Sequence, residues 1–231
     1  MAGRFRERID MAVFGPVPEF VRLSIRLRLA DPGPARGTGA AAALLARVRP
    51  AVRPAALAGW REAYAAVGLG PDVVPPPEAL GAWAATPGGV PSTGRLADVV
   101  NAFALQHGVP AAAYDLGPRS GDLWLRPARG IEHFVPMGGG PPEVPPLGEL
   151  VLVDSADRVL ARDWHGAASR PFLVGPASRD VLVHLDLLTP AAPEPSRLAD
   201  AFTRLALGFL DGHADTRTLS RTQPMVAWGG G

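Results

Sequence analysis

The segment from Val109 to Trp164 constrains the fold more than any other part of the chain. It reads as a series of short strands separated by turn residues at Gly117-Pro118, Ser120-Gly121 and Gly138 to Gly140. Between these turns apolar residues alternate with polar ones, which is typical of a sheet with one covered face. The segment therefore predicts a sheet built from several short strands.

Helices are expected on both sides of this segment, and the clearest spans Leu96 to His107. Its apolar residues recur at helical spacing and predict a buried stripe, formed by Leu96, Val99, Val100 and Phe103. Trp60 and Trp164 are expected in the core. The order of elements predicts a single α+β domain with a central mixed or antiparallel sheet and flanking helices. With 231 residues, of which 47% are hydrophobic, the chain can bury one well-packed core.

Three regions follow from this pattern. Residues 1–58 are expected to be a leader with one strand and one helix packed on the main domain, residues 59–211 the main domain, and residues 212–231 a loosely ordered tail in which Trp228 is a possible anchor. Phe20 to Leu29 alternates apolar residues with arginine, which predicts a partly exposed edge strand. No segment reaches the roughly 20 apolar residues of a membrane span, so the chain is expected to be cytoplasmic and to have no membrane partner.

The composition excludes several kinds of chemistry. The absence of cysteine removes disulfides, thiolate nucleophiles and cysteine-ligated zinc. The five histidines form no HxH or HxxxH pair, so neither a metal nor a cofactor is expected. A formal net charge of +1 is far from the strongly basic balance of proteins that hold nucleic acid by overall charge. Any contact with RNA would have to come from a local patch.

Two short patterns place a carboxylate beside an imidazole. Asp163 and His165 flank Trp164, and they share a face if that segment is extended. His184 and Asp186 share a face of the strand expected after Asp180. A carboxylate can orient an imidazole as a base, but solvated polar groups on a strand produce the same pattern. Both interpretations remain open.

The segments together resemble the B3/B4-domain family. The resemblance covers roughly residues 59–187, and the order and spacing of its pieces carry the match: GWREAYAAVGLGP, LADVVNAFALQHGVPAAAYDL, GDLWLRPARGIEHF, PLGELVLVD and RDWHGAASRPFLVGPASRDVLV. The B3/B4 domain is inserted in the beta subunit of bacterial phenylalanyl-tRNA synthetase, where it hydrolyses tRNA wrongly charged with tyrosine. The chain is still more similar to free-standing B3/B4-domain proteins.

The resemblance also implies which residues form the site. In the synthetase domain a histidine before an aromatic-aspartate pair lines the pocket, and that position is Ala112 here, before Tyr114 and Asp115. A glutamate that reads the tyrosine hydroxyl falls at His184, so His184 is the candidate catalytic residue. The framework residues that match are candidates for substrate binding: Asn101, Asp115, Arg126 and Glu132. For Arg126 and Glu132 a structural ion pair and a carboxylate- or phosphate-binding site both remain open.

The resemblance leads to two functional hypotheses. The first is a tRNA-associated protein that binds the aminoacylated acceptor end and acts as an ester hydrolase in trans. The second is a non-catalytic module that binds an amino-acid-like ligand or an RNA end. Because neither reader of tyrosine is in place, tyrosine specificity is not expected.

Overall fold

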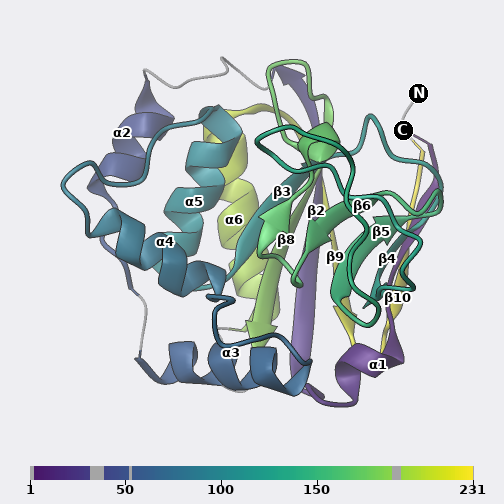
Figure 1. Cartoon of the computed structure of the whole chain (residues 1–231). Helices are drawn as coiled ribbons and strands as arrows, with labels where there is room; N and C mark the ends of the chain where they lie inside the picture. The colour runs from purple at the N-terminus through teal and green to yellow at the C-terminus, as the bar shows by residue number, and fades with distance from the viewer. Residues whose placement is uncertain (1–2, 32–38, 52–53, 189–193, 231) are drawn as a thin grey trace.

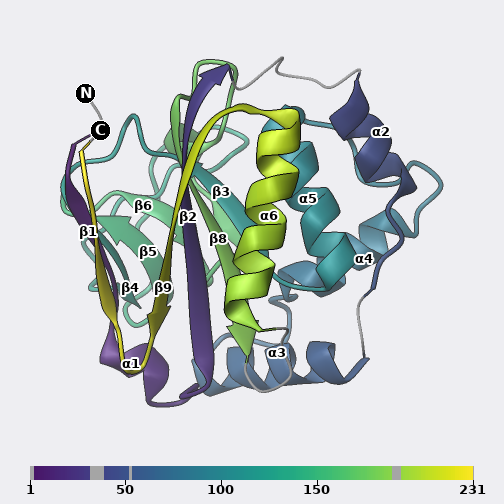
Figure 2. The same cartoon turned by 180° about the vertical axis from the view of Figure 1, so that it is seen from behind.

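A computed structural model describes residues 3–31, 39–51, 54–188 and 194–230. The chain forms three layers, in which helices cover one face of a first sheet and a second sheet lies beyond its other face (Figure 1). The view from behind shows the same arrangement (Figure 2). The expected α+β class and single domain are confirmed, with two sheets in place of one central sheet.

The first sheet has four strands among the described residues, and all neighbouring strands are antiparallel. In order across the sheet they are β3 (Ala111–Asp115), β8 (Asp180–Leu188), β2 (Phe20–Asp31) and β9 (Asp211–Ser220). Side chains along each strand point alternately to the two faces. One face, here called the outer face, lies under the helices. The other, here called the inner face, looks toward the second sheet.

The second sheet has six strands in the described part of the chain. In order across the sheet they are β10 (Met225–Trp228), β1 (Phe5–Ile9), β4 (Leu123–Pro127), β5 (Leu150–Asp154), β6 (Val159–Arg162) and β7 (Ala167–Ala168). β1 and β4 are parallel and the other pairs antiparallel, so this sheet is mixed. The one-turn helix α1 (Met11–Phe14) leads from β1 toward β2. A short 3₁₀ helix, Arg170–Phe172, follows β7.

Helices α5 (Arg95–His107) and α6 (Pro195–Phe209) cover the outer face of the four-stranded sheet (Figure 2). The predicted stripe of α5 is buried there against leucine, isoleucine and valine side chains of β2 and β8. α2 (Ala40–Arg47) and α4 (Pro76–Ala84) pack against α5, and α3 (Pro54–Ala66) lies across one end of the sheet (Figure 1). The prediction for the α5 stripe is confirmed. None of these helices combines the length and apolarity that a membrane span requires.

A second core fills the space between the two sheets. Trp60 of α3 and Trp164 of the turn after β6 are both buried in it, as predicted. Their rings meet edge to face, with centroids 5.7 Å apart. The ring of Tyr64 stacks on that of Trp164, with centroids 5.8 Å apart. The aromatic residues therefore hold α3 against the sheets and do not form an exposed stacking surface.

The alternating arginine strand differs from the sequence-based expectation. β2 is not an edge strand, because it lies between β8 and β9, and most of its side chains are buried. The physical reason lies on β8, where carboxylates stand opposite the arginines. Arg22 pairs with Asp186, and Arg26 pairs with Asp180. With these partners an arginine-rich strand can occupy the middle of a sheet.

The C-terminal region also differs from the expected loosely ordered tail. Residues 211–220 form β9 along β2, and residues 225–228 form β10 along β1. Trp228 is the anchor that the sequence indicated, since it is buried and its ring stacks on Phe5 at 6.0 Å. Backbone pairing holds the rest of this segment even though many β9 side chains are exposed.

Candidate functional site

The structure does not bring the predicted site residues together in one cleft. Asn101 lies on α5, the helix that covers the outer face of the four-stranded sheet. His184 points to the inner face of that sheet, because Val183 and Leu185 beside it belong to the outer core. Arg126 is on β4 of the second sheet and alternates with Leu125, which faces the space between the sheets. A sheet therefore separates His184 from Asn101, and another separates it from Arg126.

Arg126 and Glu132 form a closed structural unit. Glu132 is buried and accepts hydrogen bonds from the backbone N–H groups of Arg129, Gly130 and Ile131 as well as from Arg126. Burial raises the pKa of Glu132, but these donors lower it more, to about 2. Arg126 also contacts Asp157 and the Pro127 carbonyl, at 3.0 Å each. Of the two roles left open by the sequence, these contacts are those of the structural ion pair.

The Asp115 side chain stabilises a turn at the end of β3. One carboxylate oxygen accepts a hydrogen bond from the Gly117 N–H at 2.8 Å, and the other accepts one from the Ser178 hydroxyl at 2.6 Å. Ser178 lies two residues before β8, so the Asp115 side chain connects the end of one strand to the segment that leads into its neighbour. These contacts account for an aspartate at this position without a ligand.

The residues that do converge form a buried polar group between the sheets. We call it the inner cluster: Glu7 (β1), Arg22 and Ser24 (β2), Tyr64 (α3), His165 (the turn after β6), and His184 and Asp186 (β8). Each of these side chains is at most 5% exposed. The two carboxylates are its centres, and each of them contacts one of the histidines.

Glu7 is the centre of the first half. Its Oε1 accepts a hydrogen bond from the Ser24 hydroxyl at 2.8 Å, and its Oε2 accepts one from the indole Nε1 of Trp228 at 3.2 Å. Nε2 of His184 lies 2.9 Å from Oε1. Burial raises the pKa of Glu7, but His184, Arg22 and Ser24 together lower it below its ordinary value. The carboxylate is therefore ionised at neutral pH.

Asp186 is the centre of the second half. Arg22 binds it with two parallel hydrogen bonds, Nε to Oδ1 at 2.8 Å and Nη2 to Oδ2 at 2.7 Å. His165 Nε2 lies 3.2 Å from Oδ2, and His165 Nδ1 lies 2.7 Å from the Tyr64 hydroxyl. Burial raises the pKa of Asp186, but Arg22 and His165 outweigh it, so this carboxylate is also ionised. Burial keeps the Tyr64 hydroxyl protonated by raising its pKa.

Both histidines of the inner cluster are neutral at pH 7. Burial lowers the pKa of His165 and of His184, and the nearby carboxylates offset only part of that effect. A neutral imidazole carries its single proton on one nitrogen, and a carboxylate stabilises it there. Glu7 therefore favours the proton on Nε2 of His184, which leaves Nδ1 with a lone pair.

Some polar atoms around the inner cluster have no hydrogen-bond partner among the described residues. They include both ring nitrogens of His184, Nη1 of Arg22 and Nε1 of Trp164, all of them buried. For Nε2 of His184 the 2.9 Å approach to Glu7 Oε1 is an ion-pair distance without hydrogen-bond geometry. A buried polar atom without a partner costs about 1–3 kcal/mol, so several of them in one region indicate a place where a ligand or water can bind. Ala112 stands directly across from His184 in the sheet and is partly exposed.

Sequence reasoning found His184 and its neighbour Asp186 but missed Glu7, Arg22 and Ser24. One signal was present, because two alternating strands carry arginines on one and carboxylates on the other. The Asp163–His165 pairing read from the sequence does not occur as expected. Asp163 and Trp164 have φ angles of 49° and 67°, so this segment is a turn, and His165 meets Asp186 and Tyr64 instead.

No group of histidine, aspartate and glutamate side chains within the described ranges has the arrangement of a metal site. The sequence model of the B3/4 domain matches residues 59–193. Among solved structures, the chain is similar to an N-terminal fragment of the phenylalanyl-tRNA synthetase beta subunit from Pyrococcus horikoshii, with 12% identity and a TM-score of 0.48.

That similarity covers 90% of this chain and 49% of the fragment, so the chain spans about half of the fragment's length. A search of curated proteins finds no match to this sequence. The sequence model of the B3/4 domain matches more than half of the 231 residues. On that basis, the chain belongs to the B3/4-domain family.

Proposed function

We propose that this protein binds the aminoacylated end of a tRNA beside His184 and hydrolyses the aminoacyl ester in trans. Membership of the B3/4-domain family supports this class of substrate, together with the resemblance to the editing domain of phenylalanyl-tRNA synthetase. The observation that carries the proposal is the state of His184. It is a neutral imidazole whose Nε2 lies 2.9 Å from Oε1 of Glu7, and neither ring nitrogen makes a hydrogen bond to the described residues, so Nδ1 is free to accept a proton.

In the proposed reaction His184 is the general base. Its Nδ1 takes a proton from a water molecule while the water oxygen bonds to the ester carbonyl carbon. The bond between that carbon and the ribose oxygen then breaks, and the proton passes from Nδ1 to the leaving oxygen. The products are a free amino acid and an uncharged tRNA. Glu7 stabilises the imidazolium formed between these steps, as a carboxylate does for a catalytic histidine.

Ala112 supports a specificity different from that of the synthetase domain. It occupies the position of the pocket histidine there, and it lies in register with His184 on the neighbouring strand. A methyl group leaves more room beside the imidazole and offers no hydrogen bond. The site would therefore favour an amino acid without a hydroxyl group at that point.

Deacylation of a panel of mischarged tRNAs tests the proposal. We expect turnover of at least one of them, and we expect His184→Gln to lower kcat by roughly 10²- to 10⁴-fold, the usual contribution of a general base. His213→Gln is the matched control, because His213 is an exposed histidine of the same sheet and should leave kcat unchanged. The thermal midpoint of each variant shows whether it is folded. Unchanged activity in folded His184→Gln, or no turnover of any tRNA, would contradict the proposal.

The non-catalytic binding module is the second candidate, and one observation favours it. Every side chain of the inner cluster is buried, and Arg22 and Asp186 already satisfy each other. Equilibrium binding of the same charged tRNAs separates the two candidates. Saturable binding without turnover would favour the binding module.

A further inference from the structure

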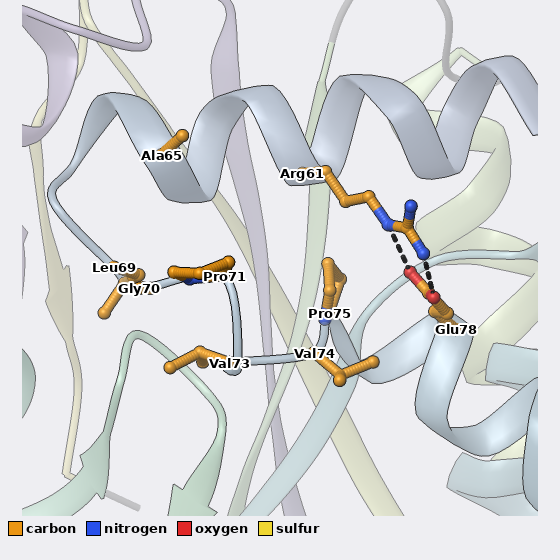
Figure 3. Close-up of a pocket in the computed structure, with 9 residues that line it drawn as sticks. All are labelled: Arg61, Ala65, Leu69, Gly70, Pro71, Val73, Val74, Pro75 and Glu78. Carbon is orange, nitrogen blue, oxygen red and sulfur yellow. Dashed lines mark hydrogen bonds and ion pairs between the residues drawn. The ribbon is translucent and has the colours of Figure 1, made fainter.

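A pocket of about 420 Å³ lies between the end of α3 and the start of α4, away from the inner cluster (Figure 3). This volume is within the range of small-molecule sites. Its walls are mostly apolar, and two charged side chains close one end. The lining residues are Arg61, Ala65, Leu69, Gly70, Pro71, Val73, Val74, Pro75 and Glu78.

The backbone around the pocket is held in place before any ligand arrives. α3 ends at Ala66, and Gly68 in the turn that follows has a left-handed φ of 82°, which suits glycine. The Leu69 N–H then donates to the Tyr64 carbonyl at 2.9 Å. Leu69 and Val73 pack on the core between the sheets. The pocket therefore has fixed walls, which lowers the entropy lost on binding.

Arg61 and Glu78 form an ion pair at one end of the pocket (Figure 3). Nε of Arg61 donates to Oε2 of Glu78 at 2.8 Å, and Nη2 donates to Oε1. The hydrogen bonds from Arg61 lower the pKa of Glu78, so both groups are charged at neutral pH. Arg61 is 66% exposed, and an exposed pair of this kind contributes little net stability. A ligand can therefore separate the two groups at low cost, provided that it offers each a new partner.

The charges at this end of the pocket restrict the chemistry of such a ligand. A carboxylate alone would bind Arg61 and leave Glu78 without its partner, and an amine alone would do the reverse. A ligand with a carboxylate and an ammonium group on one carbon satisfies both. The rest of that ligand would lie against the apolar wall, toward Ala65 and Leu69 at the other end of the pocket (Figure 3).

We propose that this pocket binds a free apolar α-amino acid, with its carboxylate on Arg61, its ammonium on Glu78 and its side chain against the valine and proline wall. The site differs from the one proposed for ester hydrolysis. α3 presents Trp60 and Tyr64 to the core and Arg61 and Ala65 to the pocket. Either site can therefore fail its test without affecting the other.

Calorimetric titration of the full chain with leucine, isoleucine, valine and phenylalanine tests the proposal. We expect saturable binding of at least one, and at least about tenfold weaker binding of its N-acetyl derivative and of its amide, which each lack one charge. Arg61→Gln and Glu78→Gln should each weaken binding about tenfold or more. The double exchange Arg61→Glu with Glu78→Arg should restore part of it, because the ligand can then bind with its charges reversed.

Two further variants serve as controls. Glu62→Gln removes an exposed carboxylate from the same helix outside the pocket and should leave the affinity unchanged. Ala65→Phe keeps the ion pair, fills the apolar end and should abolish binding. The proposal is overturned if none of the four amino acids binds saturably up to millimolar concentration. It is also overturned if the N-acetyl derivative binds as tightly as the amino acid itself, since the site would then be one for carboxylates.

Discussion

The two faces of the four-stranded sheet are both buried but are stabilised by different interactions. On the outer face β2 presents Leu23, Ile25 and Leu27 to the helices, and all three are fully buried. On the inner face the same strand presents Arg22, Ser24 and Arg26, which are equally buried. The outer face is stabilised by apolar burial, which has no directional requirement. The inner face is stabilised by ion pairs and hydrogen bonds between particular side chains. Removing one partner there should therefore lower the free energy of unfolding more than removing an apolar side chain from the outer face.

The largest effect is expected on the inner face. Asp186→Ala leaves the buried Arg22 guanidinium without its carboxylate and should lower the free energy of unfolding by about 3–5 kcal/mol. Urea denaturation measures this. The double variant Arg22→Met with Asp186→Leu replaces both charges by apolar groups and should recover most of the loss. A double variant as unstable as Asp186→Ala would mean that the pair itself, and not the unpaired charge, sets the stability.

On the outer face Ile25→Ala should cost about 2–5 kcal/mol, because it removes apolar contacts and leaves a cavity beneath α5 and α6. The same denaturation experiment measures it. Unlike the inner-face variant, this one has no charged partner to leave behind, so its cost should be the same at pH 5 and pH 7. If the cost changed with pH, the outer face would also depend on titratable groups, and the proposed difference between the two faces would be wrong.

Acidification should weaken the inner face. The pKa values of His165 and His184 are below the ordinary 6.5 in the folded protein, so the unfolded chain binds more protons as the pH falls through that value. Stability should therefore decline below pH 6.5, by about 1.4 kcal/mol per pH unit for each proton. Glu7 and Asp186, whose pKa values are lowered, contribute stability at higher pH that is lost as the pH falls below 4.5 and 3.8.

Unfolding curves at half-unit intervals from pH 2 to pH 8 measure this dependence. A variant with glutamine at positions 165 and 184 should lose most of the decline between pH 6.5 and pH 5 and keep the one at lower pH. What remains in the upper range comes from His107 of α5, whose pKa is also lowered by burial. If the wild-type protein shows no decline in that upper range, the two imidazoles are not neutral in the folded state.

The smallest effect is expected where the inner face meets solvent. Arg28 pairs with Asp215, and the two side chains are 30% and 34% exposed. Arg28→Ala should cost no more than about 1 kcal/mol, and the cost should fall further in 0.5 M salt. Denaturation at two salt concentrations checks this. A loss as large as that of Asp186→Ala would show that burial does not set the value of these pairs.

The outer face could be predicted from the sequence because its pattern depends on residues that are close together in the chain. The stripe of α5 follows from residue spacing within one helix, and the alternation in β2 follows from spacing within one strand. Neither spacing says which strand lies beside β2. The edge-strand prediction therefore rested on the arginines alone, without the aspartates that neutralise them on β8.

The inner cluster could not be predicted for the same reason. Arg22 and Asp186 are 164 positions apart, and Glu7 and Trp228 are 221 apart. His184 was identified through the family resemblance, but its partner Glu7 lies outside the matched residues 59–193. Asp163 and Trp164, in the turn before His165, have left-handed backbone conformations, and this turn changes the direction of the His165 side chain. Conformational preferences would not predict a left-handed conformation for aspartate followed by tryptophan.

The position of β2 has a consequence for how the chain folds during synthesis. Residues 20–31 are made early, yet their neighbours in the sheet are residues 180–188 and 211–220. The strand therefore has no partner in the sheet until about 150 further residues have been made. Arg22, Arg26 and Arg28 keep such an unpaired strand charged and discourage it from pairing with the strands of other chains. The residues that later bind Asp180 and Asp186 would thus first protect the nascent chain from aggregation.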